Sequence, residues 1–141
     1  MAEVMWKAMV TAILVRIAET DLKKRKLPDR LTFLLFVCGT PGIWLSGDRI
    51  WVHIIGAFAI STGLFMTDMI CPGAVGGGDI KYMAAAGWML GLWESAAAFC
   101  VAVLLAGGYC AFGVACGRLK RNSHIALGPF LCAGTAAALW L

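Results

Sequence analysis

The sequence predicts an all-α, polytopic membrane protein with about six transmembrane helices, in a single domain that comprises residues 1–141. Three observations indicate this fold class. The chain is 61% hydrophobic, whereas soluble domains are about 45–50% apolar. Its apolar residues fall into six separate segments, and its basic residues gather in alternate connections between them. The length is that of one domain.

The six apolar segments define the expected helices. They cover residues 4–20, 31–46, 50–70, 80–93, 95–116 and 124–141. A helix needs about 17–25 residues to cross a bilayer, and the first, third, fifth and sixth segments meet this length. The second does so if its helix begins at Pro28, whose fixed φ suits a first helical turn. The first has neither a basic start nor a cleavage site, so we expect it to be retained rather than removed as a signal peptide.

The fourth segment is too short to cross a bilayer by itself. Its 14 residues would form a helix about 21 Å long, against about 30 Å of hydrocarbon. Either this helix does not span, or it begins below the membrane surface. In the second case, residues 76–79 would lie at membrane depth, where irregular backbone is tolerated only against protein or a wet cavity.

Glycines and cysteines give expectations about packing. Gly87 and Gly91 form a G-xxx-G pattern in the fourth segment, which predicts close approach to a neighbouring helix. Gly107 and Gly108 predict a kink or a close contact in the fifth. The six cysteines form neither a CxxC motif nor a Cys/His cluster, so we interpret them as apolar packing residues.

The basic residues predict the orientation. If the connections after the first, third and fifth helices are cytoplasmic, that side holds all of the twelve Lys and Arg residues except Lys7 and Arg49. The run at 23–26 makes the largest contribution. By the positive-inside rule, both termini then lie outside the cytoplasm. Asp21 and Asp79 fall together on the cytoplasmic side.

The stretch Gly76-Gly77-Gly78-Asp79-Ile80-Lys81 is the strongest functional candidate. A carboxylate so close to lipid is costly and is a functional hypothesis by default. Three successive glycines allow a second peptide to approach the backbone closely. The stretch therefore suggests chemistry on a peptide. The alternative is that Asp79 is an ordinary N-cap of the fourth helix.

An acid that acts on a peptide bond in this way needs a partner. Asp21 is a candidate, but Glu19 and Asp29 are equally acidic neighbours, and Asp68 lies at the end of the third helix. The residues alone leave this choice open, and a plain charged loop is the alternative for all of them. His53 and His124 fall on opposite sides of the predicted membrane. We therefore expect no metal site.

Three blocks of sequence, in order, resemble the type IV prepilin peptidases, which are membrane aspartic proteases of the GxGD kind. Residues 21–32 (DLKKRKLPDRLT) are similar to the first-aspartate block of that family, with its D-x6-P-[ND] spacing. Residues 76–81 (GGGDIK) match the second block. Residues 128–131 (GPFL), with Gly134 beyond, resemble the C-terminal segment.

The resemblance implies that Asp21 and Asp79 are the catalytic residues. Two carboxylates that share a site share one proton, because they cannot both ionise easily, and such a pair activates water. We further expect the backbone of the second block to bind the substrate as an added strand. The expected substrate-binding residues are Gly76, Gly77, Gly78 and Lys81.

The resemblance also implies the biological setting. The expected substrate is a type IV prepilin or pseudopilin, whose basic leader is removed at the cytoplasmic face of the bacterial inner membrane. The lipid bilayer is the other expected partner; we expect no cofactor and no nucleic acid, and the oligomeric state is not predicted. Bifunctional members carry an N-terminal region for N-methylation. Since this sequence shows no such region, we expect a compact, protease-only form.

Three alternatives are compatible with the composition. A non-catalytic membrane scaffold of a pilus or secretion assembly would not need both aspartates. Another intramembrane GxGD protease would keep the pair and cleave a different substrate. A small transporter fits least well, because transporter sites lie near the middle of the membrane rather than at one face.

Overall fold

The computed structural model describes residues 1–24, 27, 29–73, 75–118 and 126–141. Within these residues the chain forms six α-helices and no strand, which confirms the predicted all-α class. The helices are α1 (Ala2–Lys24), α2 (Asp29–Ser46), α3 (Ile50–Ile70), α4 (Gly77–Leu90), α5 (Leu92–Ala115) and α6 (Gly128–Trp140).

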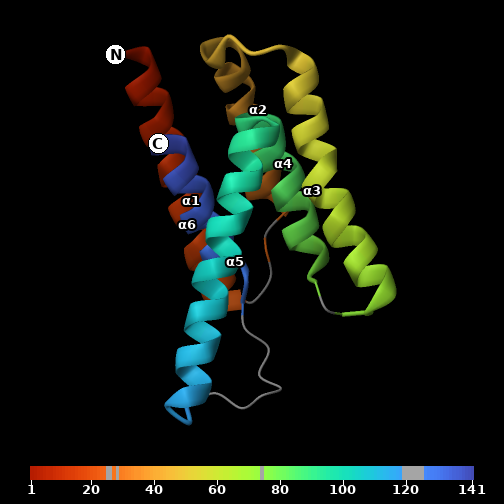
Figure 1. The fold of residues 1–141 in the computed structure, drawn as a ribbon. Coiled ribbons are helices and arrows are strands. Elements are labelled where there is room, and N and C mark those ends of the chain that lie inside the picture. Colours follow the sequence, from red (N-terminus) through yellow and green to blue (C-terminus); the bar gives the residue numbers. More distant parts are fainter. Residues whose placement is uncertain (25–26, 28, 74, 119–125) are drawn as a thin grey trace.

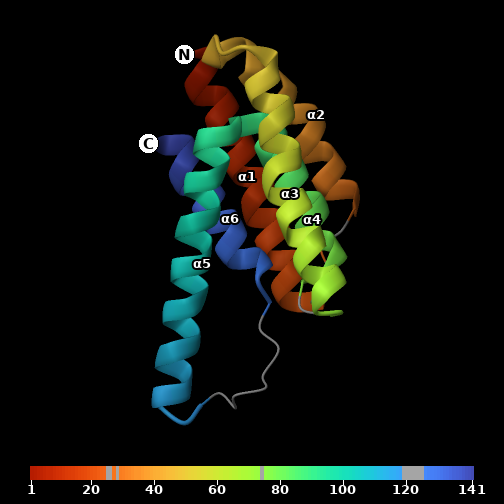
Figure 2. The ribbon, with the colours of Figure 1, turned by 45° about the vertical axis from the view of Figure 1, so that its right-hand side comes forward.

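The short helix α4 lies at the centre of the bundle (Figure 1). It packs against α2, α3, α5 and α6, while α1 lies beside α6 and α2. The chain runs up and down, so the ends of α1, α3 and α5 lie at one end of the bundle and both termini lie toward the other. Figure 2 shows that α5 extends beyond the other helices at the first of these ends. Asp21 and Asp79 therefore lie at the same end of the fold.

The start and end of α4 differ from the expected segment of residues 80–93. The helix already includes Gly77 and Gly78, so two of the three glycines are helical and only Gly76 precedes the helix, as its N-cap. The helix ends at Leu90 because Gly91 has φ +89°, a conformation that residues with a side chain rarely adopt. Trp93, expected in the fourth helix, belongs to α5.

The close packing of α4 against α3 depends on glycine. A Cβ at Gly87 of α4 would lie 2.8 Å from the backbone nitrogen of Ala57 on α3 and would collide with the carbonyl oxygen of Gly56. The G-xxx-G pattern thus marks the α3–α4 contact, as expected. Gly107 and Gly108 differ, because no other described part of the chain lies within 4 Å of a Cβ at either. The predicted close contact is not present there.

One buried hydrogen bond joins α4 to α6. The hydroxyl of Tyr82, on α4, donates to Oγ1 of Thr135, on α6, over 2.9 Å, and neither side chain is accessible to solvent. The Thr135 hydroxyl in turn donates to the carbonyl of Leu131. A satisfied buried polar network fixes one relative position of its elements. It holds the middle of α6 against the first half of α4.

The outer surface of the bundle is apolar. Exposed side chains include Phe58 on α3 and Leu104 and Phe112 on α5, each more than 65% accessible. Soluble monomers seldom expose such extensive apolar surface, whereas lipid-facing helices do. In the described residues, α3 and α5 are long and apolar enough to cross a membrane. These features suit a helical membrane protein; the number of six spans stays a prediction.

Candidate active site

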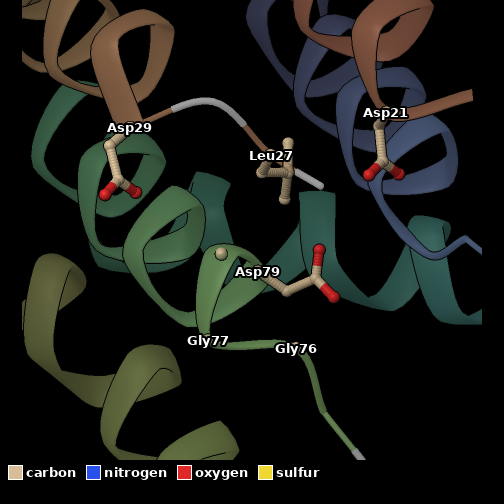
Figure 3. Close-up of a pocket in the computed structure, with 7 residues that line it drawn as sticks. Asp21, Leu27, Asp29, Gly76, Gly77 and Asp79 are labelled. Atoms are coloured by element: carbon tan, nitrogen blue, oxygen red, sulfur yellow. The ribbon is translucent and has the colours of Figure 1, made fainter. Parts of the chain in front are cut away.

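A cavity of about 290 Å³ opens at the end of the bundle where α1 ends and α4 begins (Figure 3). The carboxyl groups of Asp21 and Asp79 turn toward the same space from two different helices. Neither residue is close to the other in the sequence, so only the fold brings them together. The lining residues are Asp21, Leu27, Asp29, Gly76, Gly77, Gly78 and Asp79.

Asp21 lies in the last turns of α1 and is only 5% exposed. Its carboxylate accepts a hydrogen bond from the backbone N–H of Gly128, the first residue of α6. The contact is so close that a Cβ on Gly128 would lie 2.8 Å from Cγ of Asp21 and would collide with its Oδ2. The side chain of Asp21 is therefore fixed by the backbone at the start of α6.

Asp79 lies in the first turn of α4, two residues after its first residue. The N-cap is Gly76, which has no side chain to cap the helix, so the N-cap alternative for Asp79 is wrong. Instead, the carboxylate reaches back and accepts a hydrogen bond from the Gly76 backbone. The N–H of Asp79 donates to the Gly76 carbonyl over 2.9 Å. Gly76 therefore binds both the backbone N–H and the side-chain carboxylate of Asp79.

The two carboxyl groups perturb each other electrostatically. Both lie outside the apolar segments predicted to span the membrane. Burial, and then the negative charge of Asp21, raise the pKa of Asp79 to about 6, against an opposing effect of the hydrogen bond from Gly76. Burial also raises the pKa of Asp21, and the hydrogen bond from Gly128 opposes this. The pair thus holds a proton at a pH where isolated carboxyl groups have lost theirs.

The three glycines have different surroundings. Gly76 is extended, with φ −71° and ψ 136°, but Gly77 and Gly78 are helical, so only the first could pair with a strand. Without substrate, only Gly76 has the backbone conformation that strand pairing needs, and substrate binding by the three glycines stays a prediction. Gly77 faces open space, whereas a Cβ at Gly78 would lie 2.8 Å from Cβ of Leu27. This chain's own first connection already occupies the approach to Gly78.

The other candidate acids have different positions. Asp29 lines the cavity, but its two oxygens accept hydrogen bonds from Nζ of Lys81 over 3.0 and 3.1 Å. Lys81 itself does not line the cavity. Asp68 accepts the backbone N–H of Gly73 over 3.0 Å, which is a structural role at the end of α3. Glu19 is exposed. The cavity therefore contains Asp21 rather than Glu19 or Asp68.

The described residues contain no group of three His, Cys, Asp or Glu side chains that could hold a metal ion. His53 is buried, and its Nδ1 lies 3.1 Å from the carbonyl of Trp88 on α4. His124 and Pro28, both named in the sequence analysis, lie outside the described residues.

Two site residues were not identified from the sequence. Leu27 covers Gly78, and Gly128 holds the carboxylate of Asp21. The signal for Gly128 was present, because residues 128–131 resemble a family block, but the motif alone gives no reason for its glycine. The signal for Leu27 was absent, since a single leucine in a connection has no distinguishing pattern.

Comparison with known proteins gives the family of the chain. The profile of the type IV leader peptidase family matches residues 8–111. A protein of Bacillus subtilis (strain 168) named prepilin leader peptidase/N-methyltransferase is 34% identical over 128 residues, which are 90% of this chain and 52% of that protein. Proteins of the same name from two strains of Burkholderia pseudomallei are 30% identical over 138 residues, or 92% of this chain and 44% of theirs.

The chain spans about half the length of the curated relatives it matches. No solved structure matches it significantly. The family match nevertheless covers most of the chain, including Asp21 and Asp79. The protein therefore belongs to the type IV leader peptidase family.

Proposed function

We propose that this protein is a membrane-embedded aspartic endopeptidase that removes the leader peptide of type IV prepilins, with Asp21 and Asp79 as its catalytic pair. The observation that carries the proposal is the convergence of these two carboxyl groups, from α1 and α4, in one cavity. Each is held by a glycine backbone, and each has a raised pKa. The names of the relatives supply the substrate class.

The proposed reaction needs one proton on the pair. The ionised carboxylate takes a proton from a water molecule, which attacks the scissile carbonyl carbon. The protonated carboxyl group donates a hydrogen bond to the carbonyl oxygen and then supplies a proton to the leaving amine. The raised pKa of Asp79, about 6, supports a pair that shares one proton in mildly acidic solution, at about pH 6. The proton belongs to the pair, so the two roles are not assigned to individual residues.

The substrate chain would approach along the extended backbone that leads into α4. Gly76 is exposed and extended, and the carboxylate of Asp79, with Oδ2 3.3 Å away, is the group nearest to its Cβ position, whereas Gly77 has nothing within 4 Å of a Cβ position. A peptide can therefore come close to both glycines, next to the carboxylate of Asp79. We propose that the cavity faces the cytoplasm, because most basic residues of the sequence follow the first, third and fifth helices, and α1, α3 and α5 end at the same end of the bundle as the cavity.

The test is cleavage by the purified protein in detergent or liposomes. The substrate is a type IV prepilin, and the product is identified from the mass of its new N-terminus. We expect a single cut at the end of the basic leader, unaffected by a strong chelator. A scaffold would give no cut at all. Cleavage that is lost with a chelator and restored by zinc would contradict the aspartic mechanism.

A further inference from the structure

A second hollow lies directly beside the catalytic cavity, between α2 and α4. It has a volume of about 410 Å³. Apart from a short polar end, its lining is aromatic and aliphatic. We call it the α2–α4 groove; its lining residues are Asp29, Thr32, Phe33, Phe36, Lys81, Ala84 and Ala85.

Large side chains form the walls of the α2–α4 groove, and small side chains form its floor. Phe33 forms one wall of the groove and is 68% exposed. Exposure of an aromatic ring to water is unfavourable, so lipid or a partner is expected to cover it. The ring of Phe36 is fixed, because it stacks on Trp88 of α4 with 5.2 Å between ring centroids. Ala84 and Ala85 form the floor on α4. Such small residues let the backbone of another helix approach closely within a membrane.

The groove and the catalytic cavity meet at one ion pair. Asp29 lines both spaces, and its carboxylate binds Nζ of Lys81, which lines the groove. The pair joins the first turn of α2 to the first turns of α4. On one side of it lie the carboxyl groups of Asp21 and Asp79, and on the other lies an apolar surface. The surroundings therefore change from polar to apolar at the contact between Asp29 and Lys81.

We propose that the α2–α4 groove binds the apolar helix of the substrate that follows the scissile bond. This proposal rests on the proposed function. A peptide whose cleavage site directly precedes an apolar helix has the same change of polarity as the two joined spaces. Its helix would pack on Ala84 between the phenylalanines, and its scissile bond would lie beyond Asp29 and Lys81, in the cavity. A lipid chain could also fill the apolar groove, but it has no peptide bond to place at the adjoining carboxylates of Asp21 and Asp79.

The ion pair then has a positioning role. Lys81 and Asp29 are both more than 60% exposed, so their pairing adds little to folding stability. At the junction, however, they mark the point at which the substrate helix must end. Lys81 would thus influence where the substrate is cut without touching the reacting atoms.

Photo-crosslinking in liposomes tests the docking directly. The photoreactive amino acid p-benzoylphenylalanine replaces Phe33, or Phe58 as a matched control, since Phe58 is 67% exposed on α3. Both proteins carry Asp79→Asn, so that the substrate is not consumed. The probe is a synthetic peptide with a basic leader followed by an apolar helix. We expect crosslinks to the apolar helix from position 33 and none, or far fewer, from position 58.

Three results of the crosslinking would overturn the proposal. Equal crosslinking from both positions would mean undirected contact within the bilayer. Crosslinking from position 33 to lipid alone, or to a second copy of this chain, would assign the groove to those occupants. Because the readout is binding, it does not depend on whether the protein cleaves the peptide.

A kinetic measurement separates the groove from the chemistry. Ala84→Phe fills the groove, and Ala96→Phe makes the same change at a half-buried position on α5. Displacing one buried apolar side chain of the substrate lowers affinity on the order of tenfold. We therefore expect Ala84→Phe to raise KM about tenfold relative to Ala96→Phe, with kcat retained. Equal KM values would contradict the docking; absence of cleavage by both variants and the wild type would contradict the proposed function instead.

Discussion

Replacement of Gly128 by alanine is the sharpest structural perturbation of the site. The added Cβ would lie 2.8 Å from Cγ of Asp21 and 3.2 Å from its Cβ, and it would collide with Oδ2. Real Cβ atoms do not approach other atoms so closely, so the carboxyl group must turn away or α6 must shift. Overpacking of this kind costs about 1–3 kcal/mol. The change adds no charge and removes no titratable group.

The expected effect is on catalysis more than on folding. If the cost is taken entirely by displacement of Asp21 from its productive position, kcat/KM falls about 5- to 150-fold. The assay is prepilin cleavage at several substrate concentrations, with Tm measured in the same detergent. Gly63→Ala is the control, because a Cβ there meets nothing within 4 Å. Wild-type activity in Gly128→Ala would refute the argument that this glycine positions Asp21.

Three further predictions concern charge, packing and orientation. Carbodiimide modifies only protonated carboxyl groups, so labelling of Asp79 should decline as pH rises through about 6. Asp21→Asn removes a neighbouring negative charge, which lowers the pKa of Asp79, so the midpoint of the labelling curve should move to lower pH; an unchanged midpoint would mean that the two charges do not interact. Gly87→Ala should destabilise the protein by about 1–3 kcal/mol, because its Cβ meets backbone on α3 that cannot turn aside; a Tm equal to that of the Gly63 control would contradict this. Single cysteines at Lys24 and Asp48, in a cysteine-free background, should react with an impermeant reagent from the cytoplasmic and the opposite side respectively, and the reverse pattern would overturn the orientation.

Much of the fold could be predicted because hydropathy marks helices that face lipid. The third helix has the predicted bounds, residues 50–70. The fourth helix was predicted three residues too late because hydropathy registers only apolar side chains, and Gly77 and Gly78 in its first turn contribute almost none. The positive φ of Gly91, which ends α4, is a property of the backbone. No sequence pattern of apolar residues reports it.

The site was predictable in its residues but not in its contacts. The resemblance to the prepilin peptidases selected Asp21 and Asp79, and the structure gives them a shared cavity; their catalytic role stays a prediction. The contact between Gly128 and Asp21 depends on how α6 returns to α1, which no local pattern encodes. Likewise, the pairing of Lys81 with Asp29 depends on the packing of α2 against α4. Because Lys81 pairs with Asp29, its side chain does not line the cavity, where it was expected to bind the substrate.

The central claim is that Asp21 and Asp79 act as one catalytic unit. The most direct measurement compares prepilin cleavage by Asp21→Asn, Asp79→Asn and the double variant, with folding verified by Tm. Glu19→Gln and Asp68→Asn are the matched controls, since neither side chain lines the cavity. We expect each single variant to abolish cleavage, the double variant to be no worse, and both controls to remain active, because residues that act as a unit are not additive. Near wild-type cleavage by Asp21→Asn or Asp79→Asn would contradict the account.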